Sequence, residues 1–292
     1  MQEILKLNQI NEASVLVAIE KFVLSSLDAA RQPRSFYEKF TDLLFDFDQI
    51  YNTDFSYTCL IDLFCNLLYD YDLQRETPNS LYKLLKQSSF REWQIYFNQA
   101  RADHFNEMRQ HRYNERLNTK SLDGRLVELQ ERYSALLAVR VDLAYEPNPD
   151  IQQVSRDLEE LRKRINRSEY GKDLLLLVWA LEQGEVKGYH CHVALVFDER
   201  KRTGAWSIAK AIGELWEEIT EGDGSYFNCH DRRYLKQYEE QGIVGIGVIF
   251  SNVPYQADKM RSTLSYLARP EKEQYLRAKT TSKMRTFGMS QG

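Results

Sequence analysis

Residues 178–198 read VWALEQGEVKGYHCHVALVFD, two apolar runs separated by a short segment with a glycine at each end. Apolar runs joined through a glycine-bounded turn predict a β-hairpin, with the turn at GEVKG (184–188). Because alternate side chains of a strand leave the same face, His190 and His192 project together. The residues that project to the other face are all apolar: Cys191, Val193, Leu195 and Phe197. Two imidazoles on one face are either a satisfied polar patch or two ligands for a metal ion.

The spacing of apolar residues along the chain changes near residue 133. Up to about residue 130, apolar residues recur three and four positions apart, which predicts helices. Further strands are predicted at 135–145, 172–183 and 243–250, and further helices at 147–167, 204–220 and 256–268, the last stopped by Pro270. This order predicts an α+β fold in which helices cover one face of an antiparallel sheet and leave the face with the histidines open.

Two domains follow from this division. Residues 1–130 are predicted to form an all-α N-terminal domain that binds DNA or a partner, and residues 131–292 the domain with the sheet. The charged segment 101–132 is interpreted as an exposed surface or a linker, in which His104 and His111 are solvated.

Composition restricts the class of protein. The chain has 292 residues, 43% of them hydrophobic and 28% charged, as in soluble globular proteins. No apolar run approaches the roughly 20 residues needed to cross a bilayer, and the N-terminus does not resemble a secretion signal. The four cysteines show neither CxxC spacing nor a dense framework, so they are interpreted as reduced thiols of a cytoplasmic protein. We expect no membrane partner.

Charge is unevenly distributed along this acidic chain, whose formal net charge is −4. Residues 1–60 hold five basic against nine acidic residues, whereas residues 251–292 hold eight basic against three acidic. The basic end is either a solvated tail or a segment that follows a phosphate backbone. Five of its residues are predicted to contact phosphates: Lys272, Arg277, Lys279, Lys283 and Arg285.

Pairing of the hairpin strands brings a carboxylate toward the histidines. Glu182 ends one strand almost opposite the start of the next, within reach of His190. It is either an ordinary surface carboxylate or the third ligand of a divalent cation such as Mg²⁺ or Mn²⁺, which could polarise a phosphodiester.

Tyr266 is a candidate nucleophile on the last predicted helix. A nearby cation can favour the phenolate, and Arg269, three residues on, could supply that charge or hold a phosphate. A tyrosine there can equally be a packing residue. Three further aromatic residues could stack on unpaired bases or belong to the core: Trp179, Tyr189 and Tyr226.

A resemblance to a known family rests on an ordered set of stretches. They are AVRVDLAY (138–145), VWALEQGEVKGYHCHVALVFD (178–198), IGELWEEITEGDGSYFNC (212–229), LSYLARPEKEQYLRAK (264–279) and RTFGMSQG (285–292). In this order, over about residues 133–292, the chain resembles the inovirus-type replication initiators, relatives of the YagK/YfjJ C-terminal domain. These are placed among the HUH endonucleases of rolling-circle replication.

The resemblance implies a fold, a reaction and roles for residues. It implies an HUH/RRM-like sheet, His190 and His192 as metal ligands, and Tyr266 as the nucleophile that nicks DNA to give a 5′-phosphotyrosine and a free 3′-OH. Arg269 stands where these enzymes usually carry lysine, and arginine does not readily release a proton. Tyr275, beyond Pro270, is a second candidate nucleophile.

The implied partner is origin DNA, single-stranded or in a hairpin, in the cytoplasm of a bacterium that carries a phage, plasmid or integrated element. A host helicase or polymerase is a further partner to consider. Two other functions stay open: a cleavage-inactive, sequence-specific DNA-binding regulator, and a protein whose helical half recruits a partner. No feature of the sequence fixes the oligomeric state.

Overall fold

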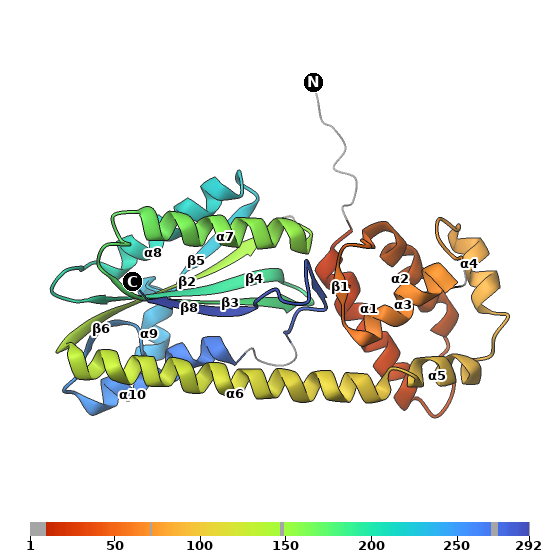
Figure 1. Ribbon diagram of the computed structural model, residues 1–292, viewed down its shortest axis with the longest axis horizontal. Coiled ribbons are helices and arrows are strands. Elements are labelled where there is room, and N and C mark those ends of the chain that lie inside the picture. Colours follow the sequence, from red (N-terminus) through yellow and green to blue (C-terminus); the bar gives the residue numbers. More distant parts are fainter. Residues whose placement is uncertain (1–9, 71, 147–148, 270–273, 292) are drawn as a thin grey trace, which may run out of the picture.

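The computed structural model describes residues 10–291 apart from residues 71, 147–148 and 270–273. The described chain has an α+β fold with ten α-helices and an antiparallel sheet of six strands, and α1 to α5 gather beside one end of the sheet (Figure 1). The helices are α1 (Glu12–Asp28), α2 (Phe36–Ile50), α3 (Cys59–Asp70), α4 (Pro78–Leu85), α5 (Phe90–Asn98), α6 (Arg101–Arg132), α7 (Ile151–Arg167), α8 (Ala205–Ile219), α9 (Arg232–Glu240) and α10 (Pro254–Ser265), followed by the 3₁₀ turn η1 (Tyr266–Ala268). The strands are β1 (Ser56–Tyr57), β2 (Ala135–Tyr145), β3 (Leu174–Gly184), β4 (Gly188–Asp198), β5 (Gly224–Asn228), β6 (Gly247–Phe250), β7 (Ala278–Lys279) and β8 (Phe287–Gln291).

The predicted hairpin is confirmed as β3 and β4, which lie at the centre of the sheet. Strand order is β5-β2-β4-β3-β8, and β6 pairs with the other end of β2. In the antiparallel register of the hairpin, Glu182 stands opposite His190 and Ala180 opposite His192. On the other side of β4, Asp142 of β2 stands opposite His192. Residues from three neighbouring strands therefore meet beside the two histidines.

The strands at the edges were harder to predict. β5 and β8 have five residues each and lie in stretches that were not assigned to strands. The strand predicted at 243–250 begins only at Gly247, whose φ of 90° is a left-handed conformation that a strand interior does not adopt. Short edge strands lack the sustained alternation that marks β3 and β4.

Both faces of the sheet are covered, so the prediction of an open face is wrong. α7 and α8 pack on one face, and α6, α10 and η1 pack on the other (Figure 1). The alternation of β4 is as predicted, because Cys191, Val193, Leu195 and Phe197 belong to the core on the α7/α8 side. His190 and His192 consequently lie under α6 and η1, buried, with 5% and 7% of their surface exposed.

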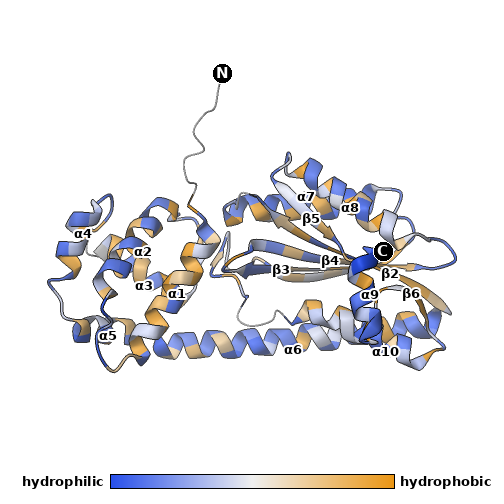
Figure 2. Ribbon diagram, turned by 180° about the vertical axis from the view of Figure 1, so that it is seen from behind, coloured by the Kyte–Doolittle hydropathy of each residue, from blue (hydrophilic) through white to orange (hydrophobic). Residues whose placement is uncertain are grey.

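The segment 101–132 is one continuous helix, α6, and not only a surface segment or a linker. α6 starts beside the N-terminal helices and then passes beneath the sheet, along most of the length of the sheet (Figure 1). Its residues are mostly hydrophilic (Figure 2). Only Leu122, Leu126 and Leu129 give it an apolar stripe, and these leucines are buried against the sheet. A stripe confined to the last third of a helix is too short to reveal by periodicity that the helix covers a sheet. None of the described helices is both long and apolar enough to span a membrane.

The N-terminal region is helical, with one exception. β1, between α2 and α3, pairs antiparallel with β7 from the C-terminal segment. Buried side chains of α1 to α5 join those on the α7/α8 side of the sheet in one cluster. A buried ion pair adds to this contact, since Arg277 donates to Glu20 of α1 at 2.5 Å and the two side chains are 2% and 3% exposed. The division at residue 130 remains a prediction, and the long helix α6 crosses it.

Candidate metal centre

Glu182, His190 and His192 form a compact group of possible metal ligands beneath α6. The Oε2 atom of Glu182 lies 3.4 Å from Nε2 of His190 and 3.5 Å from Nε2 of His192. All three side chains are buried, and one ligand atom from each lies within 4.8 Å of the others. The structure thus brings together the three residues that the sequence singled out.

The other ring nitrogen of each histidine is held by a neighbour, which aims both Nε2 atoms at Glu182. Nδ1 of His190 donates to the backbone carbonyl of Gly188 at 3.1 Å. Nδ1 of His192 lies 2.7 Å from Oδ1 of Asp142, which can only accept. Fixing Nδ1 in this way sets the tautomer and the ring orientation, as it does for histidines that bind metals.

Asp142 and Arg140 belong to this site, although sequence reasoning did not select them. Arg140 holds the Asp142 carboxylate with two bonds, Nε to Oδ1 at 3.0 Å and Nη2 to Oδ2 at 3.1 Å. A signal was available, because Arg-x-Asp in β2 interrupts an apolar strand at alternate positions, as His-x-His does in β4. The pattern was not decisive without knowing that β2 and β4 are neighbours.

Ionisation follows from these contacts. Burial by itself would raise the pKa of Glu182, but hydrogen bonds to His190 and His192 outweigh it and lower the pKa to about 2. Burial disfavours protonation of His192, yet the carboxylates of Asp142 and Glu182 raise its pKa to about 9. The pKa of Asp142 lies below its usual range because His192 and Arg140 overcome its burial. Both carboxylates are therefore ionised at neutral pH.

These residues fit a divalent cation. Ligand atoms about 2.0 to 2.2 Å from one ion stand roughly 3.0 to 3.6 Å from each other, which is the spacing found here. The second oxygen of Glu182, Oε1, is buried and has no hydrogen-bond partner among the described residues. A buried carboxylate oxygen without a partner is costly unless something else neutralises it. Two imidazoles and a carboxylate suit Mn²⁺ better than Mg²⁺, which prefers oxygen ligands.

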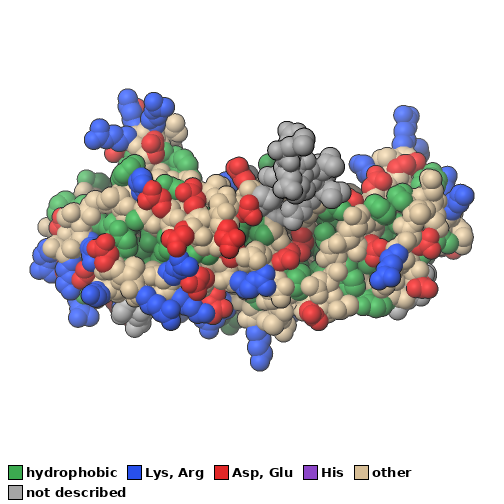
Figure 3. All heavy atoms as spheres, turned by 90° about the horizontal axis from the view of Figure 1, so that it is seen from above, with side chains coloured by type: hydrophobic (Ala, Val, Ile, Leu, Met, Phe, Trp, Pro, Cys, Tyr) green, Lys and Arg blue, Asp and Glu red, His purple; other side chains and the backbone are tan. Residues whose placement is uncertain are grey.

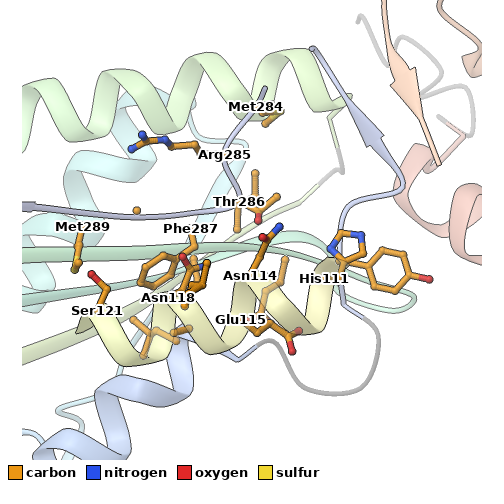
Figure 4. A pocket seen from close by; sticks show the side chains of 18 of the residues that line it. His111, Asn114, Glu115, Asn118, Ser121, Met284, Arg285, Thr286, Phe287 and Met289 are labelled. Carbon is orange, nitrogen blue, oxygen red and sulfur yellow. The ribbon is translucent and has the colours of Figure 1, made fainter. Parts of the chain in front are cut away.

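A polar cavity of about 560 Å³ leads to Glu182. α6 contributes His111, Asn114, Glu115, Asn118 and Ser121, which lie across from the C-terminal segment that carries Thr286 and Phe287 (Figure 4). This volume is typical of a site for a small molecule or a single nucleotide, so a duplex does not fit inside it.

Tyr266 is linked to the centre through Arg140 and Asp142. The guanidinium carbon of Arg140 lies 5.8 Å from the centre of the Tyr266 ring, and Arg140 in turn holds Asp142, the partner of His192. Tyr266 is half-buried in η1 and lines a second cavity, of about 690 Å³. Arg140 is thus a cation beside this ring that the sequence analysis does not single out.

Arg269 occupies a different position from the one predicted. The α-helix ends at Ser265, and Arg269 follows the 3₁₀ turn, exposed, with Nε 3.4 Å from Oγ1 of Thr119. It lines the cavity of Tyr266 together with Arg116, Lys120 and Arg261. Asp123 and Asp258 line the same cavity and pair with Arg261, so Arg116, Lys120 and Arg269 are the cations left for a phosphate. Pro270, the predicted helix stop, lies outside the described residues.

The second-choice nucleophile is in another environment. The hydroxyl of Tyr275 donates to Oε2 of Glu20 at 2.6 Å, and the ring stacks on His111 at 4.8 Å. His111 is therefore half-buried and not solvated as predicted, and burial lowers its pKa to about 4. Tyr275 also has a guanidinium over its ring, since the guanidinium carbon of Arg277 lies 4.5 Å from the ring centre. The hydrogen bond to the Glu20 carboxylate disfavours deprotonation of Tyr275, so this residue stays the second choice.

The predicted phosphate contacts differ in their surroundings. Arg277 is 2% exposed and paired with Glu20, so it is not available to DNA in this structure. Lys279 is half-buried, Lys283 and Arg285 are exposed, and Lys272 lies outside the described residues. On the side of α7 and α8, acidic and basic side chains are intermingled (Figure 3), so this face presents no uniformly basic surface to DNA.

The candidate stacking residues are mainly structural. Trp179 is 5% exposed with Arg162 over its ring, and Tyr189 is fully buried with its hydroxyl bonded to Glu12 at 2.6 Å. Tyr226 is half-buried, and its ring lies where any side chain at Gly213 would clash.

Fold and site together define an α+β protein with a buried His–His–Glu centre on the central hairpin of its sheet. The profile of the YagK/YfjJ C-terminal domain family matches residues 99–290, about two thirds of the chain. The chain therefore belongs to the YagK/YfjJ C-terminal domain family. The match begins two residues before α6, so this helix is part of the family region. No curated protein and no solved structure matches the chain.

Proposed function

We propose that this protein is a metal-dependent tyrosine nickase of the HUH type, which initiates replication of a phage, plasmid or integrated element. The supporting observations are the group of Glu182, His190 and His192, and the position of Arg140 between this group and the ring of Tyr266. A cation site beside a phenol with a guanidinium neighbour contains the parts that nucleophilic attack on a phosphodiester needs.

Each residue has a separate task in this proposal. Glu182, His190 and His192 would hold Mn²⁺ or Mg²⁺, which when bound supplies positive charge to a non-bridging phosphate oxygen. Arg140 favours the phenolate of Tyr266, whose proton passes to solvent. The phenolate oxygen forms a bond to phosphorus while the bond to the 3′ oxygen breaks. The 3′ oxygen takes a proton from solvent, which leaves a 5′-phosphotyrosine and a 3′-OH. Arg269 would bind phosphate as a fixed cation, because it does not act as an acid.

Burial of the centre restricts the substrate. The histidines lie beneath α6 and η1, and the cavity that reaches Glu182 has room for a nucleotide but not for a duplex. The substrate that fits is therefore an unpaired segment of an origin, either a single strand or the loop of a hairpin. A host polymerase would then extend the 3′-OH after a helicase opens the duplex.

The test uses single-stranded oligonucleotides tiled across the DNA on both sides of the coding region. They are incubated with the full-length protein and Mn²⁺, or with a chelator in place of the metal. The expected result is a cut strand and a covalent protein–DNA adduct that survives denaturation, seen only with the metal. His192→Ala should abolish both products, whereas Cys191→Ala, which changes the neighbouring side chain on the opposite face, should retain them.

Two outcomes would replace the proposal. Sequence-specific binding without a cut or an adduct would indicate a cleavage-inactive DNA-binding regulator, which the burial of the centre and the arginine at position 269 would then explain. If the protein binds none of the tiled strands, the favoured function is recruitment of a partner protein through the helical region.

A further inference from the structure

A second group of possible metal ligands lies far from the histidine pair, where α3 and α6 begin. Cys59 is the first residue of α3, and His104 and Glu107 lie in the first two turns of α6. One ligand atom from each lies within 4.8 Å of the others. Residues some 45 positions apart in the chain thus bring a thiol, an imidazole and a carboxylate to one place.

The carboxylate of Glu107 is already oriented toward the thiol. Its Oε1 accepts the backbone N–H of Cys59 at 3.0 Å, and its Oε2 lies 3.1 Å from Sγ of Cys59. The first contact satisfies a free N–H at the start of α3, so a purely structural role accounts for one oxygen. The thiol donates to the second oxygen, so a metal ion would replace this proton between the sulfur and the oxygen.

His104 supplies the observation that a structural role leaves unexplained. It precedes Glu107 by three residues, so the two side chains share one face of α6. Its Nδ1 atom is buried and has no hydrogen-bond partner among the described residues. A buried ring nitrogen without a partner is costly, and a metal ion would remove that cost. The prediction that His104 is solvated is therefore wrong for Nδ1, which is buried.

The surrounding charge is also suited to a cation. The carboxylates of Asp62 and Asp103 interact electrostatically with Cys59, in addition to Glu107. The carboxylates of Asp62 and Glu107 also repel each other. A divalent ion among these groups would relieve their mutual repulsion.

We propose that Cys59, His104 and Glu107 bind Zn²⁺, with the fourth position taken by water. Sulfur, nitrogen and oxygen ligands together are typical of zinc, whereas Mg²⁺ and Mn²⁺ rarely take a thiolate. On binding, the thiol loses its proton to solvent and the sulfur bonds to the ion. The ion would fasten α3 to the first turns of α6, and so connect the helical region to the helix that covers the histidine centre. This site does not depend on the proposed nicking activity.

The experiment titrates metal-stripped, full-length protein with Co²⁺ as a spectroscopic substitute for Zn²⁺. A thiolate ligand gives a sulfur-to-cobalt charge-transfer band in the near ultraviolet, which the histidine centre, having no thiolate, cannot produce. The band should grow as Co²⁺ is added, reach its maximum by two equivalents per chain because the histidine centre also takes up Co²⁺, and disappear when Zn²⁺ is added. Cys59→Ser should abolish it, and Cys65→Ser, a buried cysteine of the same helix, should leave it intact.

Two more variants separate ligation from folding. Glu107→Gln keeps an oxygen to accept the N–H of Cys59 but should weaken Zn²⁺ binding at least tenfold, and His104→Ala should do the same. His111→Ala, on the same helix, should bind Zn²⁺ as the wild type does. Absence of the band in the wild type, or its persistence in Cys59→Ser, would show that the group is only a helix cap with a thiol beside it.

Discussion

The two faces of the sheet differ in how far their apolar surface extends. Beneath α7 and α8, the inward residues of β4 are apolar from Cys191 to Phe197. Beneath α6, each of the three central strands is apolar over one half and polar over the other. The apolar half consists of Leu136 and Ala138 in β2, Leu176, Val178 and Ala180 in β3, and Ala194 and Val196 in β4. The polar half consists of Arg140 and Asp142 in β2, Glu182 in β3, and His190 and His192 in β4.

α6 has the same division along its length. Its three buried leucines, from Leu122 to Leu129, cover the apolar half of the face. The preceding turns carry Asn114, Asn118 and Ser121, which line the cavity above Glu182. One face of the sheet therefore serves mainly for stability. The face beneath α6 combines a small apolar core with a polar centre. The short apolar stripe of α6 covers only part of the strands, and the polar side chains on the rest of this face bond mainly to one another.

The strongest test of this comparison is Tyr266→Phe, on the α6 side. The substitution removes one oxygen and keeps the ring beside Arg140, so the free energy of unfolding should fall by no more than about 1 to 2 kcal/mol. Loss of the nucleophile should reduce nicking and adduct formation by a factor on the order of 10³ or more. Gel assays of the adduct measure this. Tyr275→Phe is the matched control, and an adduct mapped to Tyr275 by peptide mass spectrometry would reverse the assignment.

On the opposite face, Phe197→Ala should have the largest effect on stability. Phe197 is fully buried, so its truncation should lower the free energy of unfolding by about 3 to 5 kcal/mol. Denaturant titration measures this loss. Mn²⁺ affinity of the folded variant should equal that of the wild type, because the ring and the histidines project to opposite faces. A parallel loss of metal affinity would show that the two faces are not independent.

Glu12 tests a carboxyl group that is buried at the end of the apolar face. Its pKa is raised to about 7, mainly by burial and against hydrogen bonds from Tyr189 and Ile151. The folded state therefore holds this proton more tightly than the unfolded state, so stability from this group is full below about pH 4.5 and is lost as pH rises through 7. The loss is on the order of 3 kcal/mol. Glu12→Gln should flatten the decline between pH 5 and 8, and an unchanged pH profile would contradict the assignment.

Asp142→Asn should weaken the metal centre without removing a ligand. The amide cannot hold the Nδ1 proton of His192 as the carboxylate does, so Mn²⁺ affinity should fall by a factor of about 10 to 100. Calorimetric titration of the full-length protein with Mn²⁺ measures this. Asp157→Asn, which changes a carboxylate bonded to Tyr145 on the α7 side, serves as the control. Equal affinity in the two variants would mean that Asp142 does not position His192.

The smallest effect is expected from the exposed basic residues of the C-terminal segment. Lys283→Ala and Arg285→Ala should each reduce the salt dependence of single-strand binding, with the logarithmic slope falling by about 0.7 per lost phosphate contact. Fluorescence anisotropy at several salt concentrations measures the slope. Lys236→Ala on α9 changes an exposed lysine outside the C-terminal segment and should leave the slope unchanged. Slopes that do not change in any variant would exclude this segment from the DNA contact.

The sequence by itself determined the central hairpin, its turn and the grouping of Glu182 with the two histidines. These follow from local rules, because strand alternation fixes which side chains share a face and a short turn fixes which residues stand opposite. It also determined the apolar side of β4 and the helices α7 and α8, whose periodicity is strong.

Only the tertiary structure decided what covers the histidines and what stands beside them. α6 has too few apolar residues for its sequence to show that it packs on the sheet, so the site was predicted to be open and is buried. Asp142 and Arg140 reach His192 because β2 pairs with β4, and the pairing of strands that are distant in sequence is not a local property. Arg277 was assigned to DNA from its charge, but its side chain lies against Glu20 of α1, more than 250 residues earlier in the chain. Charge and periodicity are read one segment at a time, whereas burial and ion pairing depend on which segments meet when the chain folds.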